Sequence, residues 1–313
     1  MKISYELQLQ LLCPATKAKL IKQGNYLFNK TNSDIRYPII NDIPILISDE
    51  KSLFSIEDFQ NKVDTTWDLK PNKIKTIIRS LSPGIGLNVK AKKNYEKLNK
   101  LINANGKILV VGGSIKGEGM DVLYDNDLFE IVESDVSFGP NTRIISDAHD
   151  IPFLDETFDC VVVQAVLEHV LNPQRCVDEI HRVLKKSGLV YAETPFMQQV
   201  HMKQYDFTRF THLGHRRLFR NFEEIEHAPL MGPGTALAWS YAHFIKSFTS
   251  SKSISYFLTI FVHVTSFFLK YFDYYLIDKP GSYDAASAFF FMGRKSDQTL
   301  SDRELIKGFK GMQ

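Results

Sequence analysis

The chain has 313 residues, of which 44% are hydrophobic and 24% are charged, and its formal net charge is +2. This composition is typical of a globular protein, and the length predicts more than one domain. A net charge so close to zero argues against general nucleic-acid binding, because such proteins carry a strongly basic domain or stripe.

The cysteines and the N-terminus indicate the compartment. Cys13, Cys160 and Cys176 are odd in number and include no close pair, and Cys160 lies inside an apolar run where it acts as a small hydrophobe. The first residues lack the long apolar core of a signal peptide. We therefore expect a protein of the reducing cytoplasm.

Residues 1–50 predict a small β module. Short runs rich in β-branched and aromatic residues, separated by polar turns, are typical of strands. A turn is expected at Asn41 and Asp42. The strands are expected at residues 26–28, 37–40 and 43–47.

Residues 51–88 predict a polar linker that leads into the main domain. They mix charges with a Ser-Leu-Ser-Pro-Gly stretch at 80–84, which favours a loop holding one or two short helices. Apolar residues at helical spacing then predict a helix over 90–102. The main domain is expected to comprise residues 89–296.

Four apolar runs in this domain predict buried strands, and each run is followed by glycine or polar residues. Glycines directly after a strand let a ligand approach the backbone. The strands and their ends are 107–111 with Gly112, Gly113 and Ser114; 130–134 with Asp135; 143–145 with Ser146, Asp147 and Ala148; and 158–163 with Gln164. Because open α/β sheets bind ligands at the carboxyl ends of their strands, we expect one crevice here, with Asp135 facing a ribose hydroxyl.

A helix with clear end signals follows the fourth strand. Asn172 is the predicted N-cap, Lys185 and Lys186 are expected in the last turn, and Gly188 is expected to end the helix. The next strand, at 189–192, is expected to end above the same crevice.

The segment after Pro195 is rich in side chains that bind protons or anions. If the substrate is a hydroxyl, its proton must pass to a base, and His201, Asp206 and His212 are the candidates. Asp206 and Arg209 are three residues apart, so an ordinary ion pair between them is an equal alternative.

Residues 228–277 form a strongly apolar and aromatic insertion. The uncharged run at 253–269 is shorter than the roughly 20 residues that span a bilayer. Two interpretations stay open, a helical lid over the sheet and a peripheral membrane contact through residues 254–275. The last strand is expected at 285–294, followed by a polar tail at 297–313.

The ordered set of motifs resembles the class I S-adenosylmethionine-dependent methyltransferase family. The resemblance covers residues 107–195, including Ile-Pro-Phe-Leu-Asp-Glu-Thr-Phe-Asp at 151–159 and Val-Leu-Glu-His-Val at 166–170. It implies an α/β, doubly wound Rossmann-like sheet, mostly parallel with an antiparallel last strand. It also implies S-adenosyl-L-methionine as the cofactor.

The resemblance assigns a role to each residue of the crevice. Gly112, Gly113 and Ser114 would approach the amino-acid end and the ribose, Asp135 would accept from the ribose hydroxyls, Asp147 and Ala148 would bracket the adenine, and Gln164 would line the methionine part. Two departures are Val110, where many members have an acid, and an insertion near Ile115 and Lys116.

Two further segments show weaker resemblances. Residues 12–17 and 37–44 resemble a zinc-ribbon-like module, but Thr16 stands where that family has its second cysteine. A tetrahedral zinc site needs about four ligands, so we expect a module without metal and no metal ligands in the chain. Residues 205–211 resemble a segment of bacterial methyltransferases associated with surface-polysaccharide gene clusters.

These patterns predict an O-methyltransferase that acts on a sugar, a glycan or a lipid-linked glycan, in the cytoplasm or at the inner face of the membrane. Nucleic acid is not an expected partner. A cofactor-binding or scaffold protein without catalysis is one alternative, suggested by Val110 and the altered N-terminal ligand set. An RNA methyltransferase is another, suggested by the N-terminal module alone.

Overall fold

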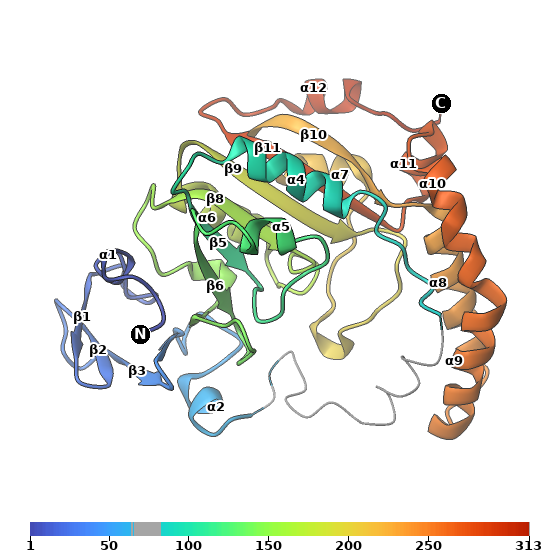
Figure 1. Ribbon diagram of the computed structural model, residues 1–313. Coiled ribbons are helices and arrows are strands. Elements are labelled where there is room, and N and C mark those ends of the chain that lie inside the picture. Colours follow the sequence, from blue (N-terminus) through green and yellow to red (C-terminus); the bar gives the residue numbers. More distant parts are fainter. Residues whose placement is uncertain (64, 66–82, 313) are drawn as a thin grey trace.

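The computed structural model describes residues 1–63, 65 and 83–312, and a single sheet of 11 strands runs through them (Figure 1). The strand order is β1-β2-β3-β4-β7-β6-β5-β8-β9-β11-β10. The central parallel strands are β7 (Ile144–Ser146), β6 (Glu130–Asp135), β5 (Lys107–Val111), β8 (Phe158–Gln164) and β9 (Leu184–Pro195). The strand β11 (Ala288–Lys295) is antiparallel to both β9 and β10 (Phe222–Met231). The predicted fold, including its antiparallel last strand, is confirmed.

Alternate residues of the central strand point to opposite faces of the sheet, as the pleat requires. Ile108 and Val110 of β5 pack with helices α4 (Ala91–Leu101) and α5 (Asp121–Tyr124). Leu109 and Val111 pack on the other face with helices α6 (Pro173–Val183) and α7 (His212–Leu218). Both faces of the sheet are therefore covered, which explains why its strands are continuous apolar runs.

The N-terminal residues extend this sheet at one edge. The strands there are β1 (Leu20–Gln23), β2 (Tyr26–Asn29), β3 (Arg36–Ile40) and β4 (Ile43–Leu46), and short helices precede and follow them at α1 (Tyr5–Gln8) and α2 (Ile56–Gln60). Asn41 and Asp42 have φ of 51° and 64°, as a tight hairpin turn needs. Strand β4 runs parallel to β7, with Ile45 opposite Ile145.

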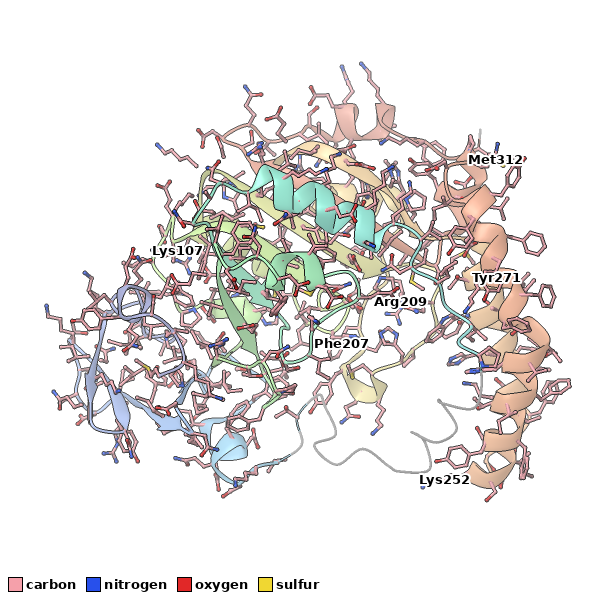
Figure 2. All side chains as sticks on the ribbon, viewed as in Figure 1. Lys107, Phe207, Arg209, Lys252, Tyr271 and Met312 are labelled. Atoms are coloured by element: carbon pink, nitrogen blue, oxygen red, sulfur yellow. The ribbon has the colours of Figure 1, made fainter. Side chains whose placement is uncertain are left out.

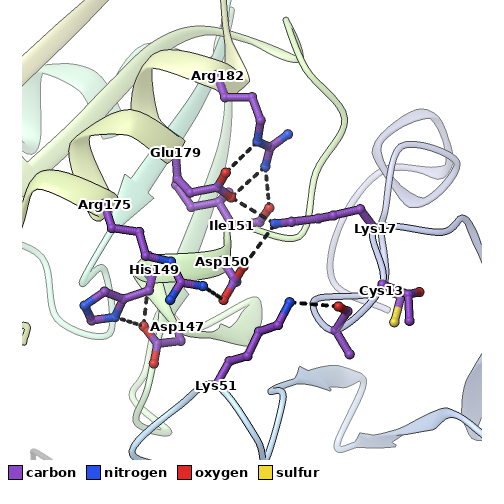
Figure 3. A network of polar contacts seen from close by, with 12 residues as sticks. Cys13, Lys17, Lys51, Asp147, His149, Asp150, Ile151, Arg175, Glu179 and Arg182 are labelled. Atoms are coloured by element: carbon purple, nitrogen blue, oxygen red, sulfur yellow. Dashed lines mark hydrogen bonds and ion pairs between the residues drawn. The ribbon is translucent and has the colours of Figure 1, made fainter. Parts of the chain in front are cut away.

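Ion pairs hold the N-terminal residues against the main domain (Figure 3). Lys17 lies 3.1 Å from Glu179 and 3.4 Å from Asp150. Arg182 pairs with Glu179 and also donates to the backbone oxygen of Ile151. Because Glu179 and Arg182 belong to α6, this helix links the sheet to the N-terminal residues.

Helix α6 begins as predicted, but it ends earlier. The Asn172 side chain accepts from the Arg175 amide, which is the expected N-cap. Leu184 already has extended backbone and pairs with Phe158, so Lys185 and Lys186 lie in β9 and not in a last helical turn. Lys185 instead contacts both carboxylate oxygens of Asp159, at 2.8 and 2.9 Å.

The apolar insertion contributes one strand and a helical arm. Strand β10 occupies its start, and the last strand begins at Ala288 because residues 280–285 form helix α11 (Pro280–Ala285). The arm comprises α8 (Pro233–Lys246), α9 (Lys252–Ser266), the 3-10 helix η3 (Phe267–Phe272) and α10 (Asp273–Leu276), and a last short helix, α12 (Asp302–Lys307), follows β11.

A buried carboxylate holds two helices of the arm together. Asp273 is fully buried and accepts from the amides of Gly234 and Thr235 at 2.7 and 3.0 Å. These amides belong to the first turn of α8, where the helix dipole favours a negative charge. A Cβ on Gly234 would meet the Leu269 carbonyl oxygen at 2.1 Å, so the contact requires glycine.

Candidate functional site

A cavity of about 340 Å³ opens at the carboxyl ends of β5, β6, β7 and β8. Residues from all four strand ends line it, as the sequence predicted. Of the predicted cofactor-binding residues, those in its lining are Gly112, Ser114, Asp135, Asp147, Ala148 and Gln164. Gly113 is not in the lining: it is buried, and a Cβ there would lie 2.8 Å from the Glu133 Cβ, so its glycine serves close packing on β6.

The glycine turn after β5 shapes the floor of this cavity. Gly112 has φ of +75°, and a Cβ there would lie 2.2 Å from a methyl group of Val166. The amides of Gly112 and Gly113 both donate to the Ser134 carbonyl, at 2.8 and 3.1 Å. The chain therefore turns immediately after the strand and leaves its end open to a ligand.

Asp135 lies at the end of β6 and belongs to the same turn. One of its carboxylate oxygens accepts from the Ser114 amide at 3.0 Å. Burial raises the pKa of Asp135, although hydrogen bonds from Ser114 act in the opposite direction. A buried carboxylate in the cavity wall is the group that the ribose hydroxyls of the cofactor require.

Asp147 is held by groups on both sides. Burial acts to raise its pKa, but hydrogen bonds from His149 and Ser52 outweigh burial and lower the pKa. Ser52 donates at 2.6 Å and the His149 ring lies at the same distance. Leu53 and Phe54, next to Ser52, complete the cavity wall. This part of the wall was not predicted from the sequence, because these residues lie in the predicted linker.

Gln164 joins the cavity to a buried acid. Its amide nitrogen donates to Glu193 at 2.8 Å, and its oxygen accepts from the Tyr95 hydroxyl at 3.2 Å. Tyr191 also donates to Glu193, at 2.7 Å. Burial raises the pKa of Glu193 to about 7. These contacts fix the Gln164 side chain at the cavity edge.

The sequence missed a second buried acid beside the cavity. Glu168 is completely buried, and neither of its carboxylate oxygens has a hydrogen-bond partner among the described residues. Burial raises its pKa to about 8. The neighbouring His169 lines the cavity, and burial lowers its pKa to about 4. A Glu-His pair soon after the strand β8 could have indicated these two residues. In the sequence, the pair contributed only to the family resemblance.

The predicted bases have three different positions. His201 lies beside the cavity, with its ring 4.9 Å from that of His169 and its Nε2 3.9 Å from Glu168 Oε1. Asp206 is paired with Arg209 at 2.8 Å, which confirms the ion-pair alternative. Burial would raise the pKa of Asp206, but Arg209 outweighs it and lowers the pKa to about 2, so Asp206 is a poor base at neutral pH.

His212, the third predicted base, lies in a buried histidine cluster and does not line the cofactor cavity. Its ring stacks on that of His227 at 4.4 Å, and Tyr283 contacts it from the side. Burial lowers the pKa of His212 to about 4 and that of His215, also in this cluster, to about 3. These histidines are neutral packing residues under β10 and β11.

Two further cavities involve the segment 198–209 and the helical arm. The first, of about 470 Å³, exposes mostly apolar surface, but polar side chains stand in its lining, and for these it is called the polar cavity below: Gln198, Gln199, Asp206, Thr208, Arg209 and His243. The second, of about 390 Å³, lies between α8 and α9 and is lined mostly by apolar groups such as Ile85, Met231, Trp239, Ala242 and Val262. His243 lines both cavities, and Met202 and Tyr205 of the same segment line the cofactor cavity.

The sheet order and the cavity define the fold of a class I S-adenosylmethionine-dependent methyltransferase. Residues 123–192 match the family model described as a methyltransferase domain, so this part of the chain carries such a domain. The cavity fits the cofactor, because the turn at Gly112 leaves the end of β5 open to it and Asp135 presents a buried carboxylate.

Several known methyltransferases are similar to parts of the chain. The demethylmenaquinone methyltransferase of Clavibacter sepedonicus is 42% identical over 45 residues, which is 14% of this chain and 18% of that protein. The ubiquinone/menaquinone biosynthesis C-methyltransferase UbiE of Pseudomonas fluorescens is 30% identical over 94 residues, or 29% and 33% of the two chains. The chain spans less than half the length of the curated relatives that it matches.

Solved structures show a distant likeness. The phosphoethanolamine N-methyltransferase 2 of Haemonchus contortus, solved with S-adenosylhomocysteine, aligns with a TM-score of 0.44 and 15% identity over 69% of this chain and 54% of that one. The 1,6-didemethyltoxoflavin-N1-methyltransferase of Burkholderia thailandensis aligns with a TM-score of 0.42 and 10% identity over 67% and 80%.

We expect Asp135→Ala to bind S-adenosylmethionine at least about tenfold more weakly, because a charged hydrogen bond contributes about 1.5–3 kcal/mol. Titration calorimetry measures the change. Asp135→Asn keeps an acceptor for the Ser114 amide but removes the negative charge. Comparing it with Asp135→Ala therefore distinguishes the effect of a disturbed turn from the effect of the lost charge. Asp155→Ala, which removes an exposed carboxylate paired with Arg182, is the matched control and should bind normally. Normal affinity in a folded Asp135→Ala protein would remove Asp135 from the site.

We expect His212→Phe to make the fold less sensitive to acid. The folded pKa of His212 is about 4, below its ordinary value of about 6.5, so protons bind the unfolded chain first as the pH falls from 6.5 to 4. Each such histidine costs about 1.4 kcal/mol of stability per pH unit in that window. Urea unfolding at pH 7, 6 and 5 should show a shallower loss in the variant. Loss of methyl transfer at pH 7 with cofactor binding retained would instead return His212 to the candidate bases.

Proposed function

We propose that the chain is an S-adenosylmethionine-dependent O-methyltransferase whose acceptor is a hydroxyl of a lipid-linked glycan. The observation that carries the proposal is the pair of cavities that share His243, one with amide, carboxylate and guanidinium side chains in its lining and one lined mostly by apolar groups. A lipid-linked glycan has the same two parts, a polyhydroxyl group and a hydrocarbon chain. An acceptor of this kind would place its sugar against segment 198–209 and its lipid between α8 and α9.

The polar cavity has groups suited to a sugar. Gln199 is held by the Ser240 hydroxyl at 3.0 Å, and its side-chain oxygen has no hydrogen-bond partner among the described residues. Arg209 is fixed by Asp206 and by the carbonyl oxygens of Gln198 and Gln199. A site whose polar side chains are held rigidly selects acceptors whose own polar groups match them. This favours a sugar over an apolar ring.

The cofactor supplies a methyl group that is already activated on a sulfonium, so the protein mainly has to position the acceptor and exclude water. Gly112 and Ser114 would hold the amino-acid end, Asp135 the ribose, and Asp147 with Ala148 the adenine. An acceptor hydroxyl must also lose a proton. His201 and Glu168 lie between the cofactor cavity and the polar cavity, where they can take part in that transfer.

The helical arm supports a membrane location for this reaction. By length and composition, Lys252–Leu276 is long and apolar enough to cross a membrane, and 11% of its most apolar window is buried in the protein. Phe257 and Tyr275 are 75% and 71% exposed, and Figure 2 shows Tyr271 directed away from the sheet. Because Asp273 of α10 is bound to the first turn of α8, the helices of the arm are held together, and we propose that the arm lies along the headgroups and does not cross.

Lysines along the arm are positioned for anionic lipids. Lys252 begins α9, and Lys270 and Lys279 lie 5.3 and 4.7 Å from the rings of Tyr271 and Tyr275. A lysine near an anionic surface contributes about 1 kcal/mol. Aromatic rings beside such lysines are typical of an interfacial anchor.

The acceptor class is tested with a methyl-labelled cofactor and three separate acceptors: a lipid-linked oligosaccharide fraction, the free oligosaccharides released from it, and a demethylated quinone. We expect label in an ether on a sugar of the lipid-linked fraction, and weaker labelling of the free sugars because they lack the lipid contact. Label in the quinone ring, or none in any sugar, would contradict the proposal.

The membrane contact is tested by liposome flotation. Wild type should float with vesicles containing anionic lipid and dissociate in part at high salt, whereas Phe257→Ser/Tyr275→Ser should remain in solution. Tyr5→Ser is the matched control, because Tyr5 is equally exposed, at 74%, but belongs to the N-terminal residues. If neither the wild-type protein nor the double variant floats, the membrane contact is contradicted and the arm is better explained as a lid over the sheet.

A further inference from the structure

We infer that Glu168, His169 and His201 form a binding site for a divalent transition-metal ion. Each offers one ligand atom, and the three atoms lie within 4.8 Å of one another. The sequence predicted no metal ligands, because Thr16 of the N-terminal module stands where a ligand cysteine would be needed. This cluster lies elsewhere, between the cofactor cavity and the segment that lines the polar cavity.

The distances suit coordination. Nε2 of His169 lies 3.5 Å and Nε2 of His201 lies 3.9 Å from Oε1 of Glu168. In a tetrahedral zinc site, with bonds near 2.1 Å, neighbouring ligand atoms lie about 3.4 Å apart. Small side-chain rotations would bring all three atoms to that spacing.

Both imidazoles are oriented with Nε2 toward the carboxylate. Nδ1 of His169 lies 2.7 Å from the Tyr205 carbonyl oxygen, and Nδ1 of His201 lies 3.2 Å from that of Gln199. A carbonyl can only accept, so each Nδ1 carries the proton and each Nε2 presents a lone pair. Metal-binding histidines are typically oriented by a carbonyl or carboxylate in this way.

The Glu168 side chain is the independent sign of a missing cation. It is completely buried, and both of its oxygens lack hydrogen-bond partners among the described residues. Arg209 does not supply the charge, because its guanidinium is occupied by Asp206 and by backbone carbonyls. A buried polar side chain without hydrogen-bond partners is costly, and coordination of a metal ion by both the carboxylate and the imidazoles would remove that cost.

The backbone holds the ligands together from two distant segments. The amides of Phe207 and Thr208 donate to the Glu168 carbonyl at 2.8 and 3.2 Å. This contact docks the segment that carries His201 onto the end of β8. The site is therefore built by the fold and does not depend on a single flexible side chain.

Two imidazoles and one carboxylate suit Zn²⁺ and other first-row divalent ions and leave coordination positions open. An acceptor hydroxyl bound there would have a lowered pKa, and its oxygen would be held beside the cofactor cavity. This role rests on the proposed function. Binding of the ion itself does not, and it is tested without cofactor or acceptor.

The test uses Co²⁺ as a spectroscopic probe on full-length protein freed of metal with a chelator. Wild type should bind one Co²⁺ per chain with visible absorption bands, and Zn²⁺ should displace it. His169→Asn and His201→Asn keep a donor for the Tyr205 and Gln199 carbonyls but lack the ligand nitrogen, and Glu168→Gln removes the charge. Each should bind at least about tenfold more weakly.

Cys13→Ser and His212→Phe are the controls, because they change the cysteine of the N-terminal module and the stacked histidine cluster, and both should bind Co²⁺ as wild type does. Melting temperatures and S-adenosylmethionine binding establish that each variant is folded. Wild type that binds no Co²⁺, or variants that bind it equally well, would overturn the metal site. Methyl transfer that persists after chelation would overturn its role in the reaction only. Metal binding without cofactor binding would instead contradict the proposed function.

Discussion

The close contact between the end of β5 and the neighbouring strands is the constraint on which the site depends. Gly112 turns with φ of +75°, and a side chain there would overlap Val166 at 2.2 Å. The Ser134 carbonyl at the end of β6 accepts from the amides of both Gly112 and Gly113. The turn is thus fixed by its neighbours on each side. It opens the strand end to a ligand, and it holds Ser114 where its amide binds Asp135.

At the carboxyl ends of the strands, the N-terminal residues also contact the cofactor cavity. Ser52 donates to Asp147, which lies at the end of β7, and Leu53 and Phe54 line the cavity beside it. Strand β4 pairs with β7 immediately before this contact. The N-terminal extension is therefore a wall of the site, which gives a physical reason for its place in the chain that requires no metal.

The sequence predicted the parts of the molecule that depend on local pattern. Apolar runs that end in glycine or acid located β5, β6 and β8, because strands buried on both faces need continuous hydrophobic sequence. The sequence-based prediction failed where contacts between distant residues determine the structure. The pairing of Leu184 with Phe158 ended α6 early, although Lys185 and Lys186 favoured a longer helix. His212 carries the residue type of a base, but only the fold reveals that His227 and Tyr283 enclose it.

Within the described part of the chain, missing hydrogen-bond partners distinguish Glu168 from the other buried acidic side chains. Asp206, Glu193 and Asp273 are buried carboxylates, and each has donors that compensate for the loss of water. Glu168 has none among the described residues, and two histidine lone pairs face it. Folding alone gives no reason to retain such a group, since an apolar residue of similar volume would be at least as stable there. Its position between the cofactor cavity and the polar cavity supplies the reason, because a buried acidic side chain that the described part of the fold leaves without hydrogen-bond partners is available to bind what enters.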